Sequence, residues 1–248
     1  MALPFGLEPA AAAFLAVAVF GAAFVRGYSG FGFSALVILA TSLVTSPLHA
    51  VPVVILCDIV MTVQQARGIW ARIDWRRVGT LMLGALVGVP LGVTIITSIG
   101  TDLARAVIAL FVLCMCALLW IGWSFRGPVG DAGTTGTGFV SGFANGAGVG
   151  GLPVAVFMTA QPVAAAVFRA TLIAYFTLLD LWSLPIMARA GMVSADTFRA
   201  TVFVLPMMVA GIWLGGRQFL RAEPQDFRRF ALILLAGLAT LGLLKSVI

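Results

Sequence analysis

RGYSGFGFSALVILATSLVTSPLHAVPVVILCDIV, residues 26–60, starts with glycines among short polar residues, passes two prolines and ends near an aspartate. Residues 141–182, SGFANGAGVGGLPVAVFMTAQPVAAAVFRATLIAYFTLLDLW, repeat this order of features. Both stretches lie in a chain that otherwise consists of long apolar runs. Glycine inside a membrane helix exposes backbone polar groups, which a bilayer tolerates only against protein or a watery cavity. The two stretches therefore predict two broken membrane helices.

The composition decides the class of protein. Hydrophobic residues make up 61% of the chain and charged residues 10%, against about 45–50% and about 25% in soluble domains. A membrane span needs about 20 apolar residues, and four runs without a charged residue are long enough: 27–57, 78–100, 106–125 and 132–168. So many apolar runs could not be buried within 248 residues, which excludes a soluble domain.

The remaining composition excludes several other classes. The N-terminus has no basic region before its apolar run, so we expect no cleaved signal peptide and a first membrane segment at Pro9–Val25. Cys57, Cys114 and Cys116 lie inside apolar runs and are interpreted as packing thiols, with no metal site, disulfide framework or cofactor. The net charge of +6 rests on arginines and indicates membrane orientation, not a nucleic-acid partner.

The sequence contains an internal repeat of two units, residues 1–124 and 127–248. VPLGVTIIT from Val89 aligns with IWLGGRQFL from Ile212 at an offset of 123, and Asp58 aligns with Asp180 at an offset of 122. Each unit predicts a glycine-broken segment followed by three spans, within one all-α membrane domain. The spans are expected at about 49–66, 77–98 and 104–124, and at about 163–188, 198–217 and 228–247.

Loop charges predict the orientation, because arginines concentrate in cytoplasmic loops. Loop 67–77 has four arginines against one aspartate, and loop 217–229 has four arginines against two acidic residues. Loops 98–105 and 189–199 carry less positive charge. We therefore expect 67–77 and 217–229 to be cytoplasmic, so that equivalent loops of the two units face opposite sides. Such inverted repeats are a transporter architecture, with the site where interrupted segments of the two halves meet.

The broken segments are candidate anion sites. A helix that restarts inside the membrane offers free N–H groups and a positive dipole end. The predicted substrate-binding residues of these segments are Ser29, Gly30, Gly32, Ser34, Asn145, Gly146, Gly148, Gly150 and Gly151. The alternative is that the glycines only let helices pack closely, but matched positions in both halves favour a site.

Several charged residues lie within the predicted spans. Asp58 and Asp180 each stand nine residues before an arginine, about 13 Å from that end of the helix. Either could carry a proton during transport, or bond to a neighbouring polar group in a structural role. Arg169 leads the candidates for a substrate ligand, because a guanidinium binds oxyanions through two parallel hydrogen bonds. The alternative is an arginine that snorkels to the membrane edge or pairs with an acid.

Three weaker candidates complete the set. Arg26 precedes the first glycine stretch and ranks behind Arg169 as a ligand. His49 could titrate near neutral pH and take part in proton coupling, although a lone histidine at a helix start is more often a cap. Gln161, beside Pro162, could line the pocket.

The arrangement resembles the sulfite exporter TauE/SafE family over nearly the whole chain. The resemblance rests on size, the duplicated plan and the glycine-rich starts RGYSGFGFS and NGAGVGGLPV, the second followed by the region of Pro162 and Arg169. In the first start, Phe31 and Phe33 stand where small residues are expected, which would narrow that pocket. The resemblance implies transport of sulfite, a sulfonate such as sulfoacetate, or another small oxyanion, usually outward, across a bacterial inner membrane.

The favoured function is a secondary transporter of a small anion. Its partners would be its substrate, the lipid bilayer and a second copy in a homodimer. Two other functions are considered beside it. An intramembrane enzyme is disfavoured, since neither aspartate lies in a catalytic signature and His49 is the single histidine. An anion channel would also explain two glycine breaks. No ATP-binding motif is present, so active transport would need an ion gradient or a partner.

Overall fold

The computed structural model describes residues 4–29, 31–65, 69–122, 124–125, 129–219 and 224–247. Within these ranges the side chains of residues 28, 29, 63–65, 165, 218, 219, 224–231 and 247 are left undescribed. The described part is all-helical and contains no strand, which confirms the predicted fold class. Its α-helices are α1 (Pro9–Ser29), α2 (Phe33–Ser42), α3 (Pro47–Gln65), α4 (Trp75–Ser98), α5 (Thr101–Ile121), α6 (Asp131–Asn145), α7 (Gly151–Thr159), α8 (Ala165–Arg189), α9 (Ala195–Phe219) and α10 (Pro224–Val247).

Two short 3-10 turns, η1 (Pro4–Gly6) and η2 (Trp70–Arg72), precede α1 and α4. Each of the six expected spans falls on one helix, in order α3, α4, α5, α8, α9 and α10, with ends shifted by a few residues. Among the described residues, five helices are long and apolar enough to cross a membrane: α1, α4, α5, α8 and α9. The chain is therefore built as a multi-pass membrane protein.

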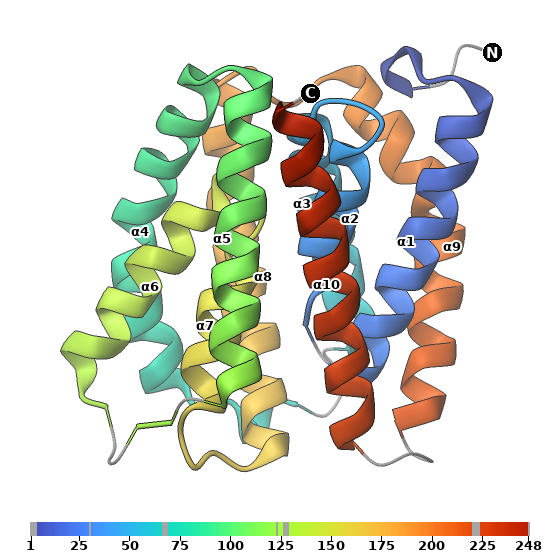
Figure 1. Ribbon diagram of the computed structural model, residues 1–248. Coiled ribbons are helices and arrows are strands. Elements are labelled where there is room, and N and C mark those ends of the chain that lie inside the picture. Colours follow the sequence, from blue (N-terminus) through green and yellow to red (C-terminus); the bar gives the residue numbers. More distant parts are fainter. Residues whose placement is uncertain are drawn as a thin grey trace.

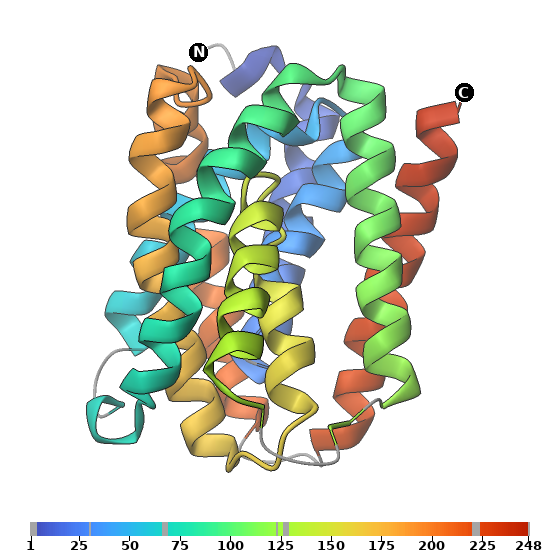
Figure 2. The same cartoon turned by 90° about the vertical axis from the view of Figure 1, so that its left-hand side faces the viewer.

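The helices form an upright bundle (Figures 1 and 2). In Figure 1, α1, α3 and α5 run downwards and α4 runs upwards, whereas α6, α8 and α10 run upwards and α9 runs downwards. The start of α4 and the end of α9 consequently lie at one end of the bundle. The loops that join α4 to α5 and α8 to α9 lie at the other end.

Two helix pairs are held together through glycines. On α4, a Cβ atom at Gly84, Gly88 or Gly92 would overlap backbone atoms of α6. On α9, a Cβ at Gly211 or Gly215 would overlap backbone atoms of α1. Small residues spaced four apart let membrane helices approach closely enough for van der Waals contact between backbones. The glycines of the second of the three spans in each unit thus form the α4–α6 and α1–α9 interfaces.

Both glycine stretches break the helix, as predicted. The first break follows α1, and Gly32 adopts the left-handed conformation there with φ of 92°. The second separates α6 from α7 and includes Gly148 with φ of 71°. Left-handed backbone of this kind favours glycine, because it lacks the Cβ that would clash. The helices that follow, α2 with 10 residues and α7 with 9, are about half the length needed to cross the hydrocarbon core.

The outer faces of the bundle are apolar. Large hydrophobic side chains are exposed along α4, α5 and α9, among them Leu83, Val87, Leu110, Val202 and Trp213. The buried core lies where α2, α3, α7 and α8 meet at the centre. A surface of this composition suits lipid contact. The polar side chains of the central pocket lie inside the bundle instead.

Candidate functional site

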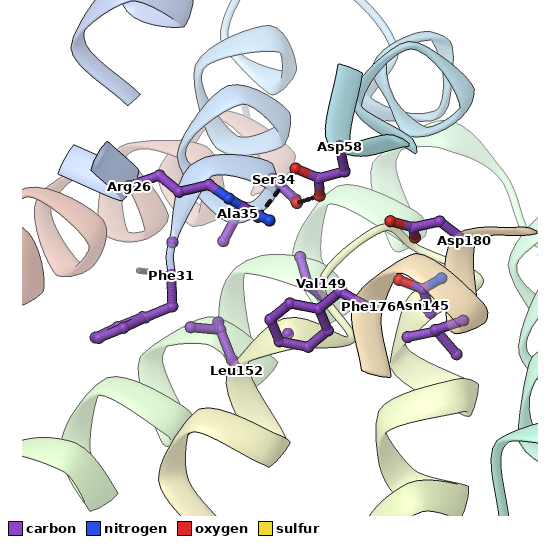
Figure 3. Close-up of a pocket in the computed structure, with 13 residues that line it drawn as sticks. Arg26, Phe31, Ser34, Ala35, Asp58, Asn145, Val149, Leu152, Phe176 and Asp180 are labelled. Atoms are coloured by element: carbon purple, nitrogen blue, oxygen red, sulfur yellow. Dashed lines mark hydrogen bonds and ion pairs between the residues drawn. The ribbon is translucent and has the colours of Figure 1, made fainter. Parts of the chain in front are cut away.

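A narrow pocket lies inside the bundle, where the two broken segments meet (Figure 3). It is bounded by the end of α1, the first turns of α2 and α7, and the middle parts of α3 and α8. Its polar side chains are Arg26, Ser34, Asp58, Asn145 and Asp180. The residues between them, including Phe31, Leu152 and Phe176, are apolar.

One side of the pocket holds a buried ion pair. Arg26 Nη1 lies 2.9 Å from Asp58 Oδ1, and the two side chains are 4% and 8% exposed. Ser34 donates a hydrogen bond of 2.9 Å from its hydroxyl to Asp58 Oδ2. The Arg26 guanidinium also lies over the Phe176 ring, with Cζ 5.9 Å from the centroid. Removing one partner of such a buried pair is strongly destabilising, because the other charge remains desolvated.

The Arg26 guanidinium has unused donor capacity. Its Nε is buried and has no hydrogen-bond partner. A planar guanidinium presents several N–H donors in a fork that matches the oxygens of an oxyanion. Buried polar groups are normally satisfied by a partner, and Arg26 is a lining residue of the pocket, so its unpaired Nε indicates that a ligand can use the donor capacity left over.

The opposite side of the pocket is organised around Asn145 and Asp180. Asn145 donates from Nδ2 to Ser183 Oγ at 2.9 Å, and Ser183 in turn donates to the Leu179 carbonyl oxygen at 2.7 Å. Asp180 lies beside Asn145 and faces the same space as Asp58 (Figure 3). Asp180 is 4% exposed. The pocket therefore combines one basic and two acidic side chains away from solvent.

Both restarting helices point their N-termini at this pocket. Gly32 is the N-cap residue of α2 and Ala35 lies in its first turn, and Gly151 and Leu152 begin α7. The first backbone N–H groups of a helix have no partner within the helix, and they carry a partial positive charge. Two such ends beside a guanidinium make a site suited to an anion.

A hydrogen-bond network fixes the start of α7. Tyr175 donates from its hydroxyl to Ser141 Oγ at 2.9 Å, and Ser141 donates to the Gly150 carbonyl oxygen at 2.7 Å. Ser141 and Tyr175 are fully buried. The network connects α6, α8 and the turn before α7, and so it positions the α7 N-terminus at the pocket.

The structure brings together many of the predicted site residues. Gly32, Ser34, Asn145, Gly151, Asp58 and Asp180 all line the pocket. Gly30 lies outside the described residues, and the side chain of Ser29 is not described. Gly146, Gly148 and Gly150 form the turn that precedes α7 and are not among the lining residues.

Arg169 and Gln161 do not line the pocket, although Arg169 lies near enough to Arg26 for their charges to repel. Arg169 is half-buried in the second turn of α8 and does not line the pocket. It shares a helix face with Asp180, as expected, but eleven residues of helix separate them by about 16 Å. Gln161 accepts a hydrogen bond of 3.2 Å from Arg77 Nη2 and donates one of 3.1 Å to the Phe157 carbonyl, near the end of the bundle that contains η2.

His49 belongs to the other end of the bundle. Its ring stacks on Phe5 with centroids 4.7 Å apart, and its Nδ1 lies 3.2 Å from Thr45 Oγ1. His49 lies in the first turn of α3, about two and a half turns before Asp58. The surrounding second pocket is apolar, with Val19, Val53 and Phe203 in its wall.

The sequence pattern ranks Arg26 behind Arg169 and does not mark Phe176 or Leu152 as pocket walls. Arg26 is the last charged residue before the uncharged run 27–57, and that isolation was the available signal. Phe31 lines the pocket, as expected of a residue that narrows it, whereas Phe33 is buried away from the lining. Phe176 carries no signal in the sequence, because one more aromatic residue in an apolar span is unexceptional.

The fold and the pocket define a polytopic membrane protein whose broken helices enclose a charged central site, an arrangement typical of secondary transporters. The family model for the sulfite exporter TauE/SafE matches residues 15–241. The chain belongs to this family, which consists of transporters and not of enzymes. No curated protein and no solved structure matched the chain.

Proposed function

We propose that the protein is a secondary transporter that moves a small sulfur-containing oxyanion, such as sulfite, sulfoacetate or a related organosulfonate, out of a bacterial cell across its inner membrane. The anion is held near the middle of the membrane by the N-termini of α2 and α7 and by an arginine. The single observation that carries the proposal is the meeting of both helix N-termini with the buried Arg26 guanidinium in one pocket. Membership of the TauE/SafE family supports a sulfur oxyanion as the substrate.

The helix arrangement supports alternating access. In an inverted repeat, each helix of one unit runs opposite to its counterpart, and corresponding helices make corresponding contacts. The opposite directions of α1 and α6, and of α4 and α9, agree with that relation (Figure 1). The α4–α6 and α9–α1 glycine interfaces agree with it too. The fixed central site would then open to either side as one unit rocks against the other.

An ion gradient is the expected energy source. Asp58 and Asp180 are the carboxylates that could carry protons, because both lie in the central pocket. His49 is a less suitable proton carrier, since it lies about two and a half helical turns from Asp58 along α3. Arg169 stays a candidate ligand for a state in which the pocket opens towards the end of the bundle where α8 begins.

Transport by the full-length protein reconstituted in liposomes tests the proposal. Vesicles are loaded with sulfite, thiosulfate, sulfoacetate or taurine, and efflux is followed for each compound. We expect a saturable flux with counterflow for at least one sulfur oxyanion, and little flux of taurine, which carries a cationic amine. Ohmic currents without counterflow would instead identify the alternative function, an anion channel. Absence of any flux above protein-free vesicles would contradict both.

A further inference from the structure

Arg26 is the only basic side chain among the described residues that line the central pocket. It contacts Asp58 through Nη1 at 2.9 Å, while its Nε lacks a hydrogen-bond partner. A guanidinium binds an oxyanion best when two parallel N–H groups meet two oxygens. Asp58 therefore contacts the Arg26 guanidinium through a single N–O pair, which leaves part of the donor fork unpaired.

Asp58 stands where an oxyanion substrate would bind. Its carboxylate is itself an oxyanion, and it accepts from the Ser34 hydroxyl on one oxygen while the other faces Arg26. A bound sulfonate or sulfite would need the same cation. The five N–H donors of one guanidinium can contact both groups, but its single positive charge cannot neutralise the carboxylate and the substrate together.

The charges of the pocket strengthen the competition between the Asp58 carboxylate and the substrate anion. Arg26 faces two acids, Asp58 and Asp180, within a space away from solvent. A substrate anion added to two ionised carboxylates would leave excess negative charge in a medium of low dielectric, which is strongly unfavourable. A proton from solvent on Asp58 removes one negative charge and releases Arg26 at the same time.

We propose that Asp58 is an internal competitor for the substrate's place on Arg26, so that binding of the anion is linked to uptake of one proton by the Asp58 carboxylate. This inference rests on the proposed function and adds the identity of the coupling group to it. When the anion leaves, Asp58 returns its proton to solvent and pairs with Arg26 again. The empty site is then neutral on that side, and the transporter can reorient without exposing a desolvated arginine.

Other titratable groups face the same region and have to be separated from Asp58 experimentally. Asp180, Tyr175 and Arg169 lie on α8, Cys57 is next to Asp58 on α3, and Arg26 lies on α1. Arg169 keeps its positive charge throughout the pH range of the test, so it adds no proton uptake of its own. α2 contributes the Ser34 hydroxyl, which does not titrate in the physiological range. Asp180 is the essential comparison, because it shares the pocket but forms no ion pair with Arg26 among the described contacts.

Calorimetric titration of the purified full-length protein with sulfoacetate tests the linkage. The measurement is made from about pH 6 to about pH 8.5. In this range sulfoacetate keeps its charges, and carboxyl groups with ordinary pKa values are ionised. Each titration is repeated in two buffers with different ionisation enthalpies, which reports protons taken up on binding. We expect about one proton per anion at the upper end, and affinity that falls about tenfold per pH unit there.

Asp58→Asn should bind the anion with no proton uptake and with an affinity that does not change with pH. Asp180→Asn is the matched control and should keep the proton uptake of the wild type, whatever its absolute affinity. Proton uptake that persists in Asp58→Asn, or that is lost only in Asp180→Asn, would overturn the assignment of Asp58 as the coupling group. If Asp58→Asn fails to fold, the wild-type protein still decides: binding without proton uptake contradicts the proposal.

The liposome assay distinguishes failure of the proposed transport function from failure of the proposed role of Asp58. Saturable flux of a sulfur oxyanion together with binding that takes up no proton would leave the proposed function standing and remove the role of Asp58. No flux and no binding with any compound of the panel would remove both.

Discussion

Gly88 and Gly211 stand 123 positions apart and occupy equivalent places on two different helix pairs. Gly88 of α4 lies against the backbone of Phe139 on α6, and Gly211 of α9 lies against the backbone of Phe20 on α1. The offset is the one that aligns the two units of the sequence. Two backbone contacts of this kind at matched positions imply that close helix approach supports the pocket from both sides.

Gly88→Ala should destabilise the protein, because the added methyl group would overlap the backbone of α6. Overpacking of this kind costs about 1–3 kcal/mol, and the melting temperature in detergent should fall by several degrees. Gly79→Ala is the matched control on α4, since a Cβ at Gly79 meets no atom within 4 Å. Equal melting temperatures for the two variants would contradict the contact.

The same comparison on α9 tests the equivalence of the pairs. Gly211→Ala should lower the melting temperature by a similar amount, for a Cβ there meets backbone atoms of α1. Gly216→Ala should be close to wild type, because a Cβ there meets no atom within 4 Å. If Gly211→Ala were as stable as Gly216→Ala, the α1–α9 interface would be looser than the structure indicates.

Single cysteines in a cysteine-free background should report opposite sides of the membrane at Ala71 and Ala190. Both residues are exposed; Ala71 lies in η2, just before α4, and Ala190 caps the C-terminus of α8. The start of α4 and the end of α8 lie at opposite ends of the bundle (Figure 1). The arginine-rich loop 67–77 is predicted to be cytoplasmic, so Ala71→Cys should react with a membrane-impermeant maleimide only after the cells are opened. Ala190→Cys should react in intact cells. Labelling of both from the same side would rule out the inverted topology.

Loss of the Tyr175–Ser141–Gly150 network should weaken transport as well as stability. Ser141→Ala removes the bond to the Gly150 carbonyl and the acceptor for Tyr175, which should cost about 1–3 kcal/mol of stability. The start of α7 would then be less well fixed, so the apparent KM for the transported anion should rise. Thr137→Ala is the control on α6, because the Thr137 hydroxyl bonds only within its own helix, to the Gly133 carbonyl. A normal KM in Ser141→Ala would show that the network does not position the site.

Much of the fold followed from the sequence, because hydrophobic length and loop charge are local properties. The helix breaks at the glycine stretches and the six later spans could be read in this way. The partner of Asp58 could not, since Arg26 and Asp58 lie on different helices and no spacing rule relates them. The contact of Gln161 with Arg77 depends likewise on how the α7–α8 turn packs against the start of α4. Helix periodicity placed Arg169 on the face of Asp180, but it carried no information on which part of that face borders the pocket.

The two arginines give the sharpest test of the site. Arg26→Lys keeps the positive charge but loses the fork that can pair with an oxyanion. The lost charge-assisted hydrogen bond should weaken anion binding about tenfold or more. If Arg26 alone holds the anion, Arg169→Lys should transport nearly as well as wild type, because Arg169 is half-buried and does not line the pocket.

Both variants are compared by sulfoacetate counterflow in liposomes, with melting temperature as the measure of folding. A folded Arg26→Lys protein with normal affinity, beside an Arg169→Lys protein with reduced affinity, would assign the anion to Arg169. Snorkelling alone predicts that lysine replaces Arg169 without loss, whereas a ligand role predicts a loss as large as the one expected at Arg26. The sign of the difference between the two variants therefore identifies the arginine that holds the anion.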